Sequence, residues 1–185
     1  MMTRRTLLAN AGWATVGIAL RAWGQEKKPL APTESNIEGP FYRKNAPFRE
    51  KLAEGVKGKP LTIAGKVLAP DGAPLGNAVV DVWQADTKGA YDNKSDKFTL
   101  RGRIKTDKNG LYRYETIMPG QYDLGESKRP AHIHYKISAE GHKALTTQLY
   151  FSGDPFLKKD PFVHESLIID LKESKGDFDI VLAKV

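Results

Sequence analysis

The sequence predicts an all-β protein, a single-domain β-sandwich of mostly antiparallel strands with long loops. Short β-like runs alternate with Gly, Pro, Asn and Asp, and no stretch shows sustained helical periodicity. The chain has 185 residues, which suffices for one hydrophobic core but not comfortably for two. Short strands with turn signals at this spacing favour a sandwich over a parallel α/β sheet.

The N-terminus resembles a signal peptide, which we place at residues 1–24. Arg4 and Arg5 precede an uncharged apolar stretch over residues 7–20, shorter than the roughly 20 residues that span a bilayer. The arginine pair is typical of twin-arginine signals, which export proteins already folded and loaded with cofactor. An ordinary secretory signal and an uncleaved anchor remain open. We expect an exported protein, periplasmic or secreted, with no stable membrane insertion after processing.

The domain proper is expected over residues 33–185, after a polar linker at 25–32. Loss of the three leader arginines would lower the formal charge from +7 to +4. Lysines are scattered and form no long run, so the composition argues against nucleic-acid binding. The absence of cysteine excludes a disulfide scaffold. A homo-oligomer is compatible with these observations, which do not select an assembly state.

The first strands are expected at 61–68 and 78–84, separated by the turn Pro70-Asp71-Gly72. Residues 103–106 and 111–117 are predicted to form a hairpin closed by an Asn-Gly turn. The remaining strands are expected at 132–138, 145–151 and 178–182.

Two of the four histidines, His132 and His134, stand two residues apart in a predicted strand. The two-residue period of a strand puts both imidazoles on one face, with Cα atoms about 6.6 Å apart. That spacing suits two nitrogen ligands of one metal ion, although two ordinary half-buried histidines would have the same pattern. No Asp or Glu lies within three residues of the pair, so other ligands must come from elsewhere.

Two tyrosines follow turn-like segments from which their side chains could point into a cleft. Tyr91 follows Lys88-Gly89-Ala90, and Tyr122 follows Pro119-Gly120-Gln121. With an ordinary pKa near 10, a tyrosine ionises at neutral pH only beside a strong cation. A packing role is open for each of them.

The order of several motifs resembles the intradiol ring-cleavage dioxygenases, a family that includes catechol 1,2-dioxygenases and protocatechuate 3,4-dioxygenases. The likeness covers about residues 33–156. It rests on Glu38-Gly39-Pro40-Phe41-Tyr42, Val82-Trp83-Gln84-Ala85, Gly89-Ala90-Tyr91, 98–103, Pro119-Gly120-Gln121-Tyr122, 129–134, 145–148 and Gly153-Asp154.

The resemblance implies a non-haem Fe(III) centre ligated by two tyrosinates, Tyr91 and Tyr122, and by His132 and His134. It implies cleavage of a catechol-type ring between its two hydroxyl-bearing carbons by O2, giving a cis,cis-muconate-type diacid. Tyr122 would leave the iron and accept a substrate proton. Arg129 would stabilise negative charge on the substrate. The implied partners are therefore a small catechol-type molecule and O2, and the particular catechol stays open.

Several further residues also receive assignments. The resemblance places Gln148 near the oxygen-binding side, and Tyr42 is a candidate pocket residue. Trp83 is interpreted as a core residue, and His142 and His164 as surface or loop histidines. Two rival functions are an exported β-sandwich binding module without turnover and a zinc hydrolase, which two tyrosines fit poorly.

Overall fold

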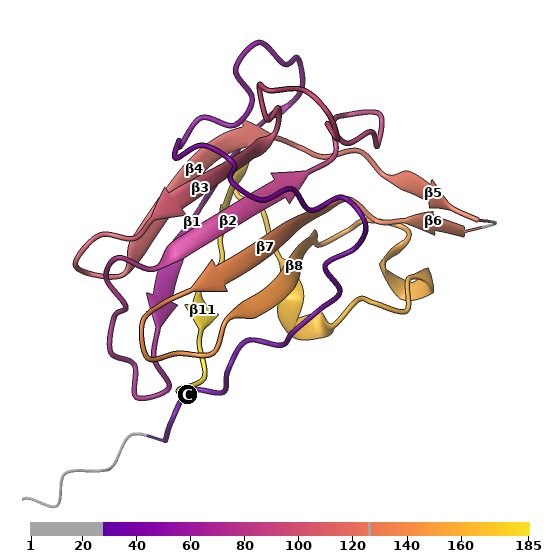
Figure 1. Cartoon of the computed structure of the whole chain (residues 1–185). Coiled ribbons are helices and arrows are strands. Elements are labelled where there is room, and N and C mark those ends of the chain that lie inside the picture. The colour runs from indigo at the N-terminus through magenta and orange to yellow at the C-terminus, as the bar shows by residue number, and fades with distance from the viewer. Residues whose placement is uncertain (1–27, 126) are drawn as a thin grey trace, which may run out of the picture.

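The computed structural model describes residues 28–125 and 127–185 (Figure 1). The expected signal peptide at 1–24 lies outside this range. Within it, no helix combines the length and the apolar character that a membrane crossing requires. The all-β prediction is confirmed, because the only helices in this range are two short 3-10 turns, η1 (Leu157–Lys159) and η2 (Glu165–Leu167).

One sheet is built around β1 (Pro60–Leu68). Along one edge β1 pairs antiparallel with β4 (Leu111–Ile117). Along the other it pairs parallel with two short strands near the C-terminus, β10 (Lys175–Asp177) and β11 (Ile180–Val181).

The second sheet has the order β3-β2-β7-β8-β9. Its first four strands are antiparallel neighbours, and only the short β9 pairs parallel. These strands are β2 (Val79–Gln84), β3 (Arg101–Lys105), β7 (His132–Ser138), β8 (Leu145–Phe151) and β9 (Ile168–Ile169). A separate hairpin, β5 (Tyr122–Leu124) with β6 (Ser127–Arg129), projects from the sandwich in Figure 1.

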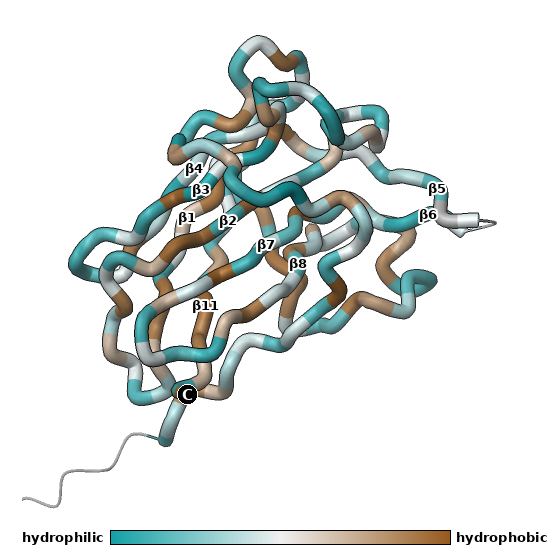
Figure 2. Tube along the Cα trace, in the orientation of Figure 1, coloured by the Kyte–Doolittle hydropathy of each residue, from teal (hydrophilic) through white to brown (hydrophobic). Residues whose placement is uncertain are grey.

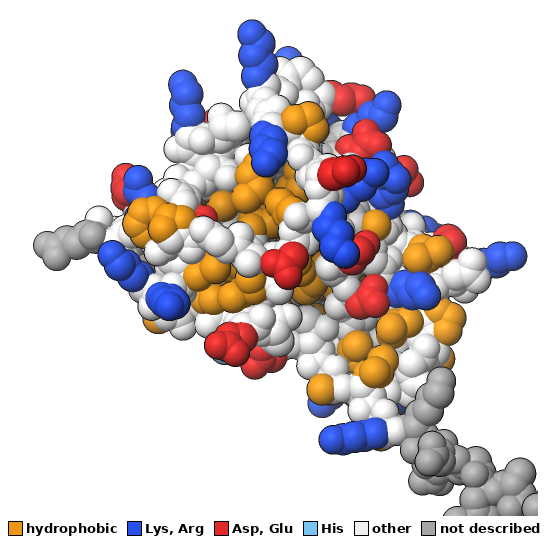
Figure 3. Space-filling model, turned by 180° about the vertical axis from the view of Figure 1, so that it is seen from behind, with side chains coloured by type: hydrophobic (Ala, Val, Ile, Leu, Met, Phe, Trp, Pro, Cys, Tyr) orange, Lys and Arg blue, Asp and Glu red, His pale blue; other side chains and the backbone are white. Residues whose placement is uncertain are grey.

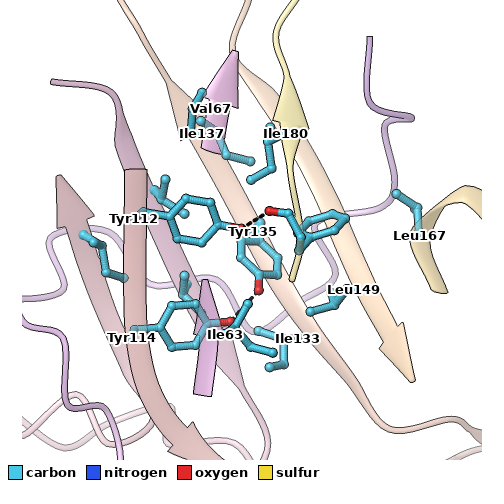
Figure 4. Packing of buried hydrophobic residues seen from close by; sticks show 14 of the residues in the cluster. Ile63, Val67, Tyr112, Tyr114, Ile133, Tyr135, Ile137, Leu149, Leu167 and Ile180 are labelled. Carbon is cyan, nitrogen blue, oxygen red and sulfur yellow. Dashed lines mark hydrogen bonds between the residues drawn. The ribbon is translucent and has the colours of Figure 1, made fainter. Parts of the chain in front are cut away.

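The core lies between the two sheets, where alternate residues of facing strands meet. Hydrophobic residues gather on the strands, whereas much of the connecting chain is hydrophilic (Figure 2). Tyr135 of β7 packs near Tyr112 and Tyr114 of β4, and its hydroxyl is hydrogen-bonded to that of Tyr114 (Figure 4). The Tyr112 hydroxyl donates to the Phe178 carbonyl at 2.5 Å, so the hydroxyls of these three tyrosines are all hydrogen-bonded.

One predicted pairing is wrong. The strands on either side of the Asn109-Gly110 turn exist, but they do not form a hairpin, because β3 pairs with β2 and β4 pairs with β1. The turn instead carries the chain from one sheet to the other. Asp107 holds it through Oδ1, which accepts hydrogen bonds from the backbone N–H groups of Asn109 and Leu111.

The N-terminal segment 34–49, which we call the strap, runs over the five-stranded sheet on the side away from the core (indigo in Figure 1). Backbone hydrogen bonds join Asn36 to Thr146 of β8 and Arg49 to Arg103 of β3. The candidate site lies between this strap and the sheet. On the opposite side of the molecule, basic and acidic side chains are interspersed (Figure 3).

A buried carboxyl under the strap makes stability depend on pH. Burial raises the pKa of Asp81 from 3.8 to about 6, although a hydrogen bond from Tyr42 and the charges of Arg103 and Lys136 oppose the shift. The folded chain therefore binds this proton more tightly than the unfolded chain does. Stability conferred by the protonated form is present below about pH 4 and is lost as pH rises through about 6.

We therefore expect Asp81→Asn to stabilise the protein by on the order of 2 kcal/mol at pH 8 and to have little effect at pH 4. The amide stays neutral and still accepts the Tyr42 hydrogen bond. Chemical denaturation at both pH values measures the difference. Asp170→Asn, at an exposed position, is the control. An equal effect of Asp81→Asn at both pH values would contradict this expectation.

Candidate metal centre

β7 places both histidines of the His-x-His pair on one face. Ile133, Tyr135 and Ile137 alternate with them and belong to the hydrophobic core. His132 and His134 are buried, and their ring centroids lie 4.9 Å apart with the planes at 72°. The prediction that a strand would bring these imidazoles together is confirmed.

Two tyrosines reach the same place from separate segments of the chain. Tyr91 lies beyond the end of β2, and its hydroxyl oxygen is 3.4 Å from Nε2 of His132. Tyr122 begins β5, and its ring centroid is 5.4 Å from that of His132. The rings of Tyr91 and Tyr122 are 5.9 Å apart, and that of Tyr91 is 6.1 Å from His134. The four side chains predicted as ligands thus form one cluster.

The donor set of this cluster decides which metal fits. Across residues 28–125 and 127–185, no group of three or more His, Cys, Asp or Glu side chains is placed to hold a metal ion. A metal bound here would need the two tyrosine oxygens beside the two imidazoles. Phenolate oxygens are hard anionic donors and suit a trivalent cation such as Fe(III) better than they suit the softer ions that thiolates select.

His132 is held in the tautomer that a metal ligand needs. Its Nδ1–H donates to the Pro130 carbonyl oxygen at 2.7 Å, which leaves the lone pair of Nε2 facing the cluster. Burial, with the nearby Arg129 charge, lowers the pKa of His132 to about 4. The ring is therefore neutral at pH 7 and able to donate to a cation.

His134 is a buried imidazole without a hydrogen-bond partner. Neither of its ring nitrogens has one among the described residues, and the residue is 1% exposed. Burial and the neighbouring His132 hold its pKa well below the ordinary value, whereas the backbone of Ile37 opposes the shift without reaching hydrogen-bond geometry. An unsatisfied buried ring is costly. A metal ion between the four side chains would engage the lone pair of one ring nitrogen, so these residues fit the group.

Trp83 accounts for the orientation of His134. It lies directly across from His134 in the β2–β7 register, and the two rings stack at 4.9 Å with planes 7° apart. The residue is buried, as predicted, but it packs against the candidate site and lies outside the hydrophobic cluster between the sheets.

The hydroxyl of Tyr91 is poorly placed to ionise without a cation. Burial, followed by the proximity of Tyr122, raises its pKa well above the ordinary value, and the charges of Arg129 and Arg101 offset only part of this. Phe41 of the strap stacks on the Tyr91 ring at 4.3 Å and covers one of its faces. A tyrosinate at this position would thus need a cation such as a bound metal.

The loops that carry the two tyrosines interlock through glycines. A Cβ on Gly89 would lie 2.5 Å from the Gln121 carbonyl oxygen and 2.7 Å from Cβ of Tyr122, and Gly89 has φ of +82°. A Cβ on Gly120 would lie 2.5 Å from the Thr87 carbonyl oxygen. Asp86 ties the loops together, because its carbonyl oxygen accepts a hydrogen bond from the Gly120 N–H at 2.8 Å. Only glycine permits this approach.

We expect Gly89→Ala to separate these loops, lowering both iron binding and the free energy of unfolding, the latter by at least about 2 kcal/mol. The new methyl group meets backbone atoms and cannot rotate away. Gly141→Ala is the matched control, since Gly141 also has positive φ but its Cβ would meet nothing within 4 Å. Denaturant unfolding and iron analysis measure the two effects. Equal losses in both variants would show that strain alone, and not loop contact, matters.

Arg129 ends β6 opposite Tyr122 in the hairpin register. Its Nη1 donates to the Tyr122 hydroxyl at 3.3 Å and lies 3.4 Å from Nε2 of His132. A fixed guanidinium at this point can stabilise negative charge that develops beside the predicted ligands.

Gln148 braces this arginine. Its Oε1 accepts hydrogen bonds from Nη2 of Arg129 at 3.0 Å and from the Tyr150 hydroxyl at 2.9 Å. Its Nε2 donates to the Ile37 carbonyl at 2.9 Å and lies 3.3 Å from Oδ1 of Asn36. The amide is thus fully engaged within the protein. The geometry places Gln148 in the support of Arg129 and shows no free donor directed at the cluster.

Several contacting residues were not identified from the sequence. Tyr150 bonds to Arg129 at 3.0 Å, and Asp160 bonds to it at 2.6 Å. Tyr150 lies across from His132 in the β7–β8 register, a signal that needs the strand pairing to be known. Asp160 comes from the loop after β8 and has no local signal.

Tyr42, a candidate pocket residue from the sequence, lies one layer behind the predicted ligands. Its ring centroid is 4.8 Å from that of Trp83.

The other two histidines take no part in the cluster. His142 contacts the Glu140 carbonyl through Nδ1, and Nδ1 of His164 lies 3.6 Å from Glu34. Their interpretation as surface or loop residues agrees with these positions.

The fold and site define a β-sandwich protein with a buried tyrosine–histidine cluster suited to a metal ion. A family model described as a dioxygenase matches residues 37–182. Catechol 1,2-dioxygenase of Acinetobacter baylyi is 38% identical over 168 residues, 76% of this chain and 54% of that protein. 6-Chlorohydroxyquinol 1,2-dioxygenase of Cupriavidus pinatubonensis is 33% identical over 184 residues, 85% of this chain and 67% of that protein. The chain belongs to the intradiol dioxygenase family.

A solved structure extends this similarity to the fold. The dioxygenase domain of a dioxygenase carbohydrate-binding protein fusion from Streptomyces sp. SirexAA-E has a TM-score of 0.76 and 37% identity. The match covers 84% of this chain and 100% of that domain. By contrast, this chain spans only about half the length of the Acinetobacter relative.

Proposed function

We propose that this protein is a non-haem Fe(III)-dependent intradiol dioxygenase that cleaves a catechol-type ring between its hydroxyl-bearing carbons. The convergence of Tyr91, Tyr122, His132 and His134 carries the proposal, together with the ring nitrogens of His134, which have no hydrogen-bond partner among the described residues. Membership of the intradiol dioxygenase family and the names of the similar dioxygenases support it. The reaction would consume O2 and yield a cis,cis-muconate-type diacid.

The chain's own groups would bind the substrate and move its protons. The ferric ion, when bound, would act as a Lewis acid and template for the two substrate oxygens. Tyr122 is the group suited to accept a substrate hydroxyl proton at Oη, because Nη1 of Arg129 stands 3.3 Å away and can stabilise the phenolate before transfer. Arg129 would then stabilise negative charge on the substrate. Phe41 shields the Tyr91 ring on one face.

Colour and oxygen uptake test the proposal. Purified protein should be reddish from tyrosinate-to-iron charge transfer and should contain iron by metal analysis. Oxygen uptake is then measured with catechol, protocatechuate, hydroxyquinol and substituted catechols. Colourless protein without iron would overturn the assignment. Iron-loaded protein that takes up oxygen with none of these substrates would instead favour a binding module of the same fold.

We also propose that the protein is exported through a twin-arginine signal at residues 1–24. Arg4 and Arg5 before an uncharged stretch support this. The proposed Fe(III) cofactor supports it as well, because the twin-arginine route exports proteins that are already folded with their cofactor. Fractionation of cells that express the full chain and its Arg4→Lys, Arg5→Lys variant is the test. Unchanged export of the variant would exclude the twin-arginine route.

A further inference from the structure

We propose that Asp160 is a positioning residue of the candidate metal centre, which holds Arg129 in place and cancels its charge so that a buried cation can stand beside a bound metal ion. The inference rests on the proposed function, since it presumes that the tyrosine–histidine cluster binds iron. It assigns a role to a residue from a loop that supplies no predicted ligand.

The contact between Asp160 and Arg129 is short and fully enclosed. Oδ2 of Asp160 lies 2.6 Å from Nε of Arg129, and the two side chains are 1% and 3% exposed. Every other ion pair in the described part of the chain has both side chains at least 15% exposed. Removal of either partner of such a buried pair leaves an uncompensated buried charge. The pair therefore matters for the charge balance of the site as well as for its geometry.

Asp160 is itself fixed, so it can fix the arginine. Its Oδ1 accepts a hydrogen bond from the Phe162 N–H at 2.8 Å. The Phe162 ring lies 5.1 Å from the Arg129 guanidinium carbon, and the Phe162 carbonyl oxygen is 3.2 Å from the Tyr150 hydroxyl. The segment that carries the carboxylate therefore packs directly against the arginine.

This arrangement assigns a task to each nitrogen of Arg129. Nε is occupied by Asp160, and Nη2 by Gln148 and Tyr150. Only Nη1 is directed at the predicted ligands. Asp160 thus selects which edge of the guanidinium faces the site, and a change at Nε would rotate the group away from it.

Asp160 also balances the charge of Arg129. An arginine whose Nη1 lies 3.4 Å from a ligand nitrogen would repel a metal cation if its charge were not compensated. Burial excludes the water that would otherwise screen it. With Asp160 ionised, the pair is neutral as a whole, so its N–H groups can act on the site without a net positive charge beside the metal.

A double-mutant cycle tests both roles of Asp160, the positioning of Arg129 and the compensation of its charge. The four proteins are the native chain, Asp160→Asn, Arg129→Gln and the double variant. Iron affinity is measured by competition with a chelator, together with the charge-transfer absorption and the melting temperature of each protein. Asp71→Asn is the matched control, because Asp71 also forms an ion pair, with Lys184 at 2.9 Å, but with side chains 56% and 61% exposed.

We expect Asp160→Asn to lower iron affinity by about 10- to 100-fold and to shift the charge-transfer band. In the Arg129→Gln background the same substitution should change iron affinity by no more than about twofold, because no cation is left to compensate. Asp71→Asn should match the native protein. A role of Asp160 in loop packing alone predicts the same loss in both backgrounds.

Two results would overturn the inference: native iron affinity in Asp160→Asn, or an equal loss in both backgrounds. If Asp160→Asn does not fold, a loss of iron affinity of more than about twofold between Arg129→Gln and the double variant would still overturn the inference. A native protein that binds no iron would overturn the proposed function, and the inference with it. If the native protein binds iron and either of the two results above is obtained, the inference is overturned and the proposed function stands.

Discussion

Replacement of Tyr91 by phenylalanine is expected to bleach or shift the reddish colour of the iron-loaded protein. The substitution removes one oxygen donor and keeps the ring that packs on Phe41 at 4.3 Å, so the fold should persist. Iron affinity should fall by more than the roughly 10- to 100-fold that loss of an outer-shell partner costs. Visible absorption and iron analysis on protein of verified melting temperature measure the result.

Tyr112→Phe is the matched control for this substitution. Tyr112 is equally a buried tyrosine, but its hydroxyl donates to the Phe178 carbonyl within the core. Its loss should cost about 1 kcal/mol of stability and leave the colour unchanged. If Tyr91→Phe retains the native spectrum and iron content, then Tyr91 is not a ligand.

Substitution of Arg129 by glutamine is expected to lower kcat by about 100- to 1000-fold while iron stays bound. Its Nη1 donates to the Tyr122 hydroxyl at 3.3 Å and lies 3.4 Å from Nε2 of His132, so the substitution removes a charged donor placed beside two predicted ligands. Because the ligands themselves remain, the colour should persist. Steady-state oxygen uptake with the preferred catechol, normalised to bound iron, measures the loss.

The exposed Arg113 on β4 provides the control. Its side chain is 60% exposed and pairs with the exposed Glu115, so Arg113→Gln should leave kcat unchanged. A kcat for Arg129→Gln close to the native value would remove Arg129 from the reaction. Loss of iron together with activity would instead place its role in metal binding.

Local patterns were sufficient to predict most strands. The runs at 132–138 and 145–151 became β7 and β8 with the predicted bounds, because alternation and flanking turns are properties of the segment itself. Pairing is not such a property. The Asn109-Gly110 turn carries a hairpin signal, yet its flanking strands find better partners in β1 and β2, which lie earlier in the chain.

In the site, too, local features were predictable from the sequence and contacts between distant segments were not. His132 and His134 reveal their shared face through a two-residue period, and motif order identified the two tyrosines. The contacts that orient these side chains cross between strands and loops. Trp83 meets His134 only through the β2–β7 register, and Asp160 reaches Arg129 from a different loop. No spacing within the sequence encodes such contacts, so the supporting residues emerged only from the fold.

The position of β1 has a consequence for how the chain folds. Ile63 pairs with Gly176 and Val67 with Ile180, so one edge of this strand stays open until β10 and β11 have been made. Pairing over so great a sequence separation is entropically slow. During synthesis the early strands would therefore emerge with an unpaired edge, a surface that invites association between nascent chains. Completion of the C-terminal segment closes that edge.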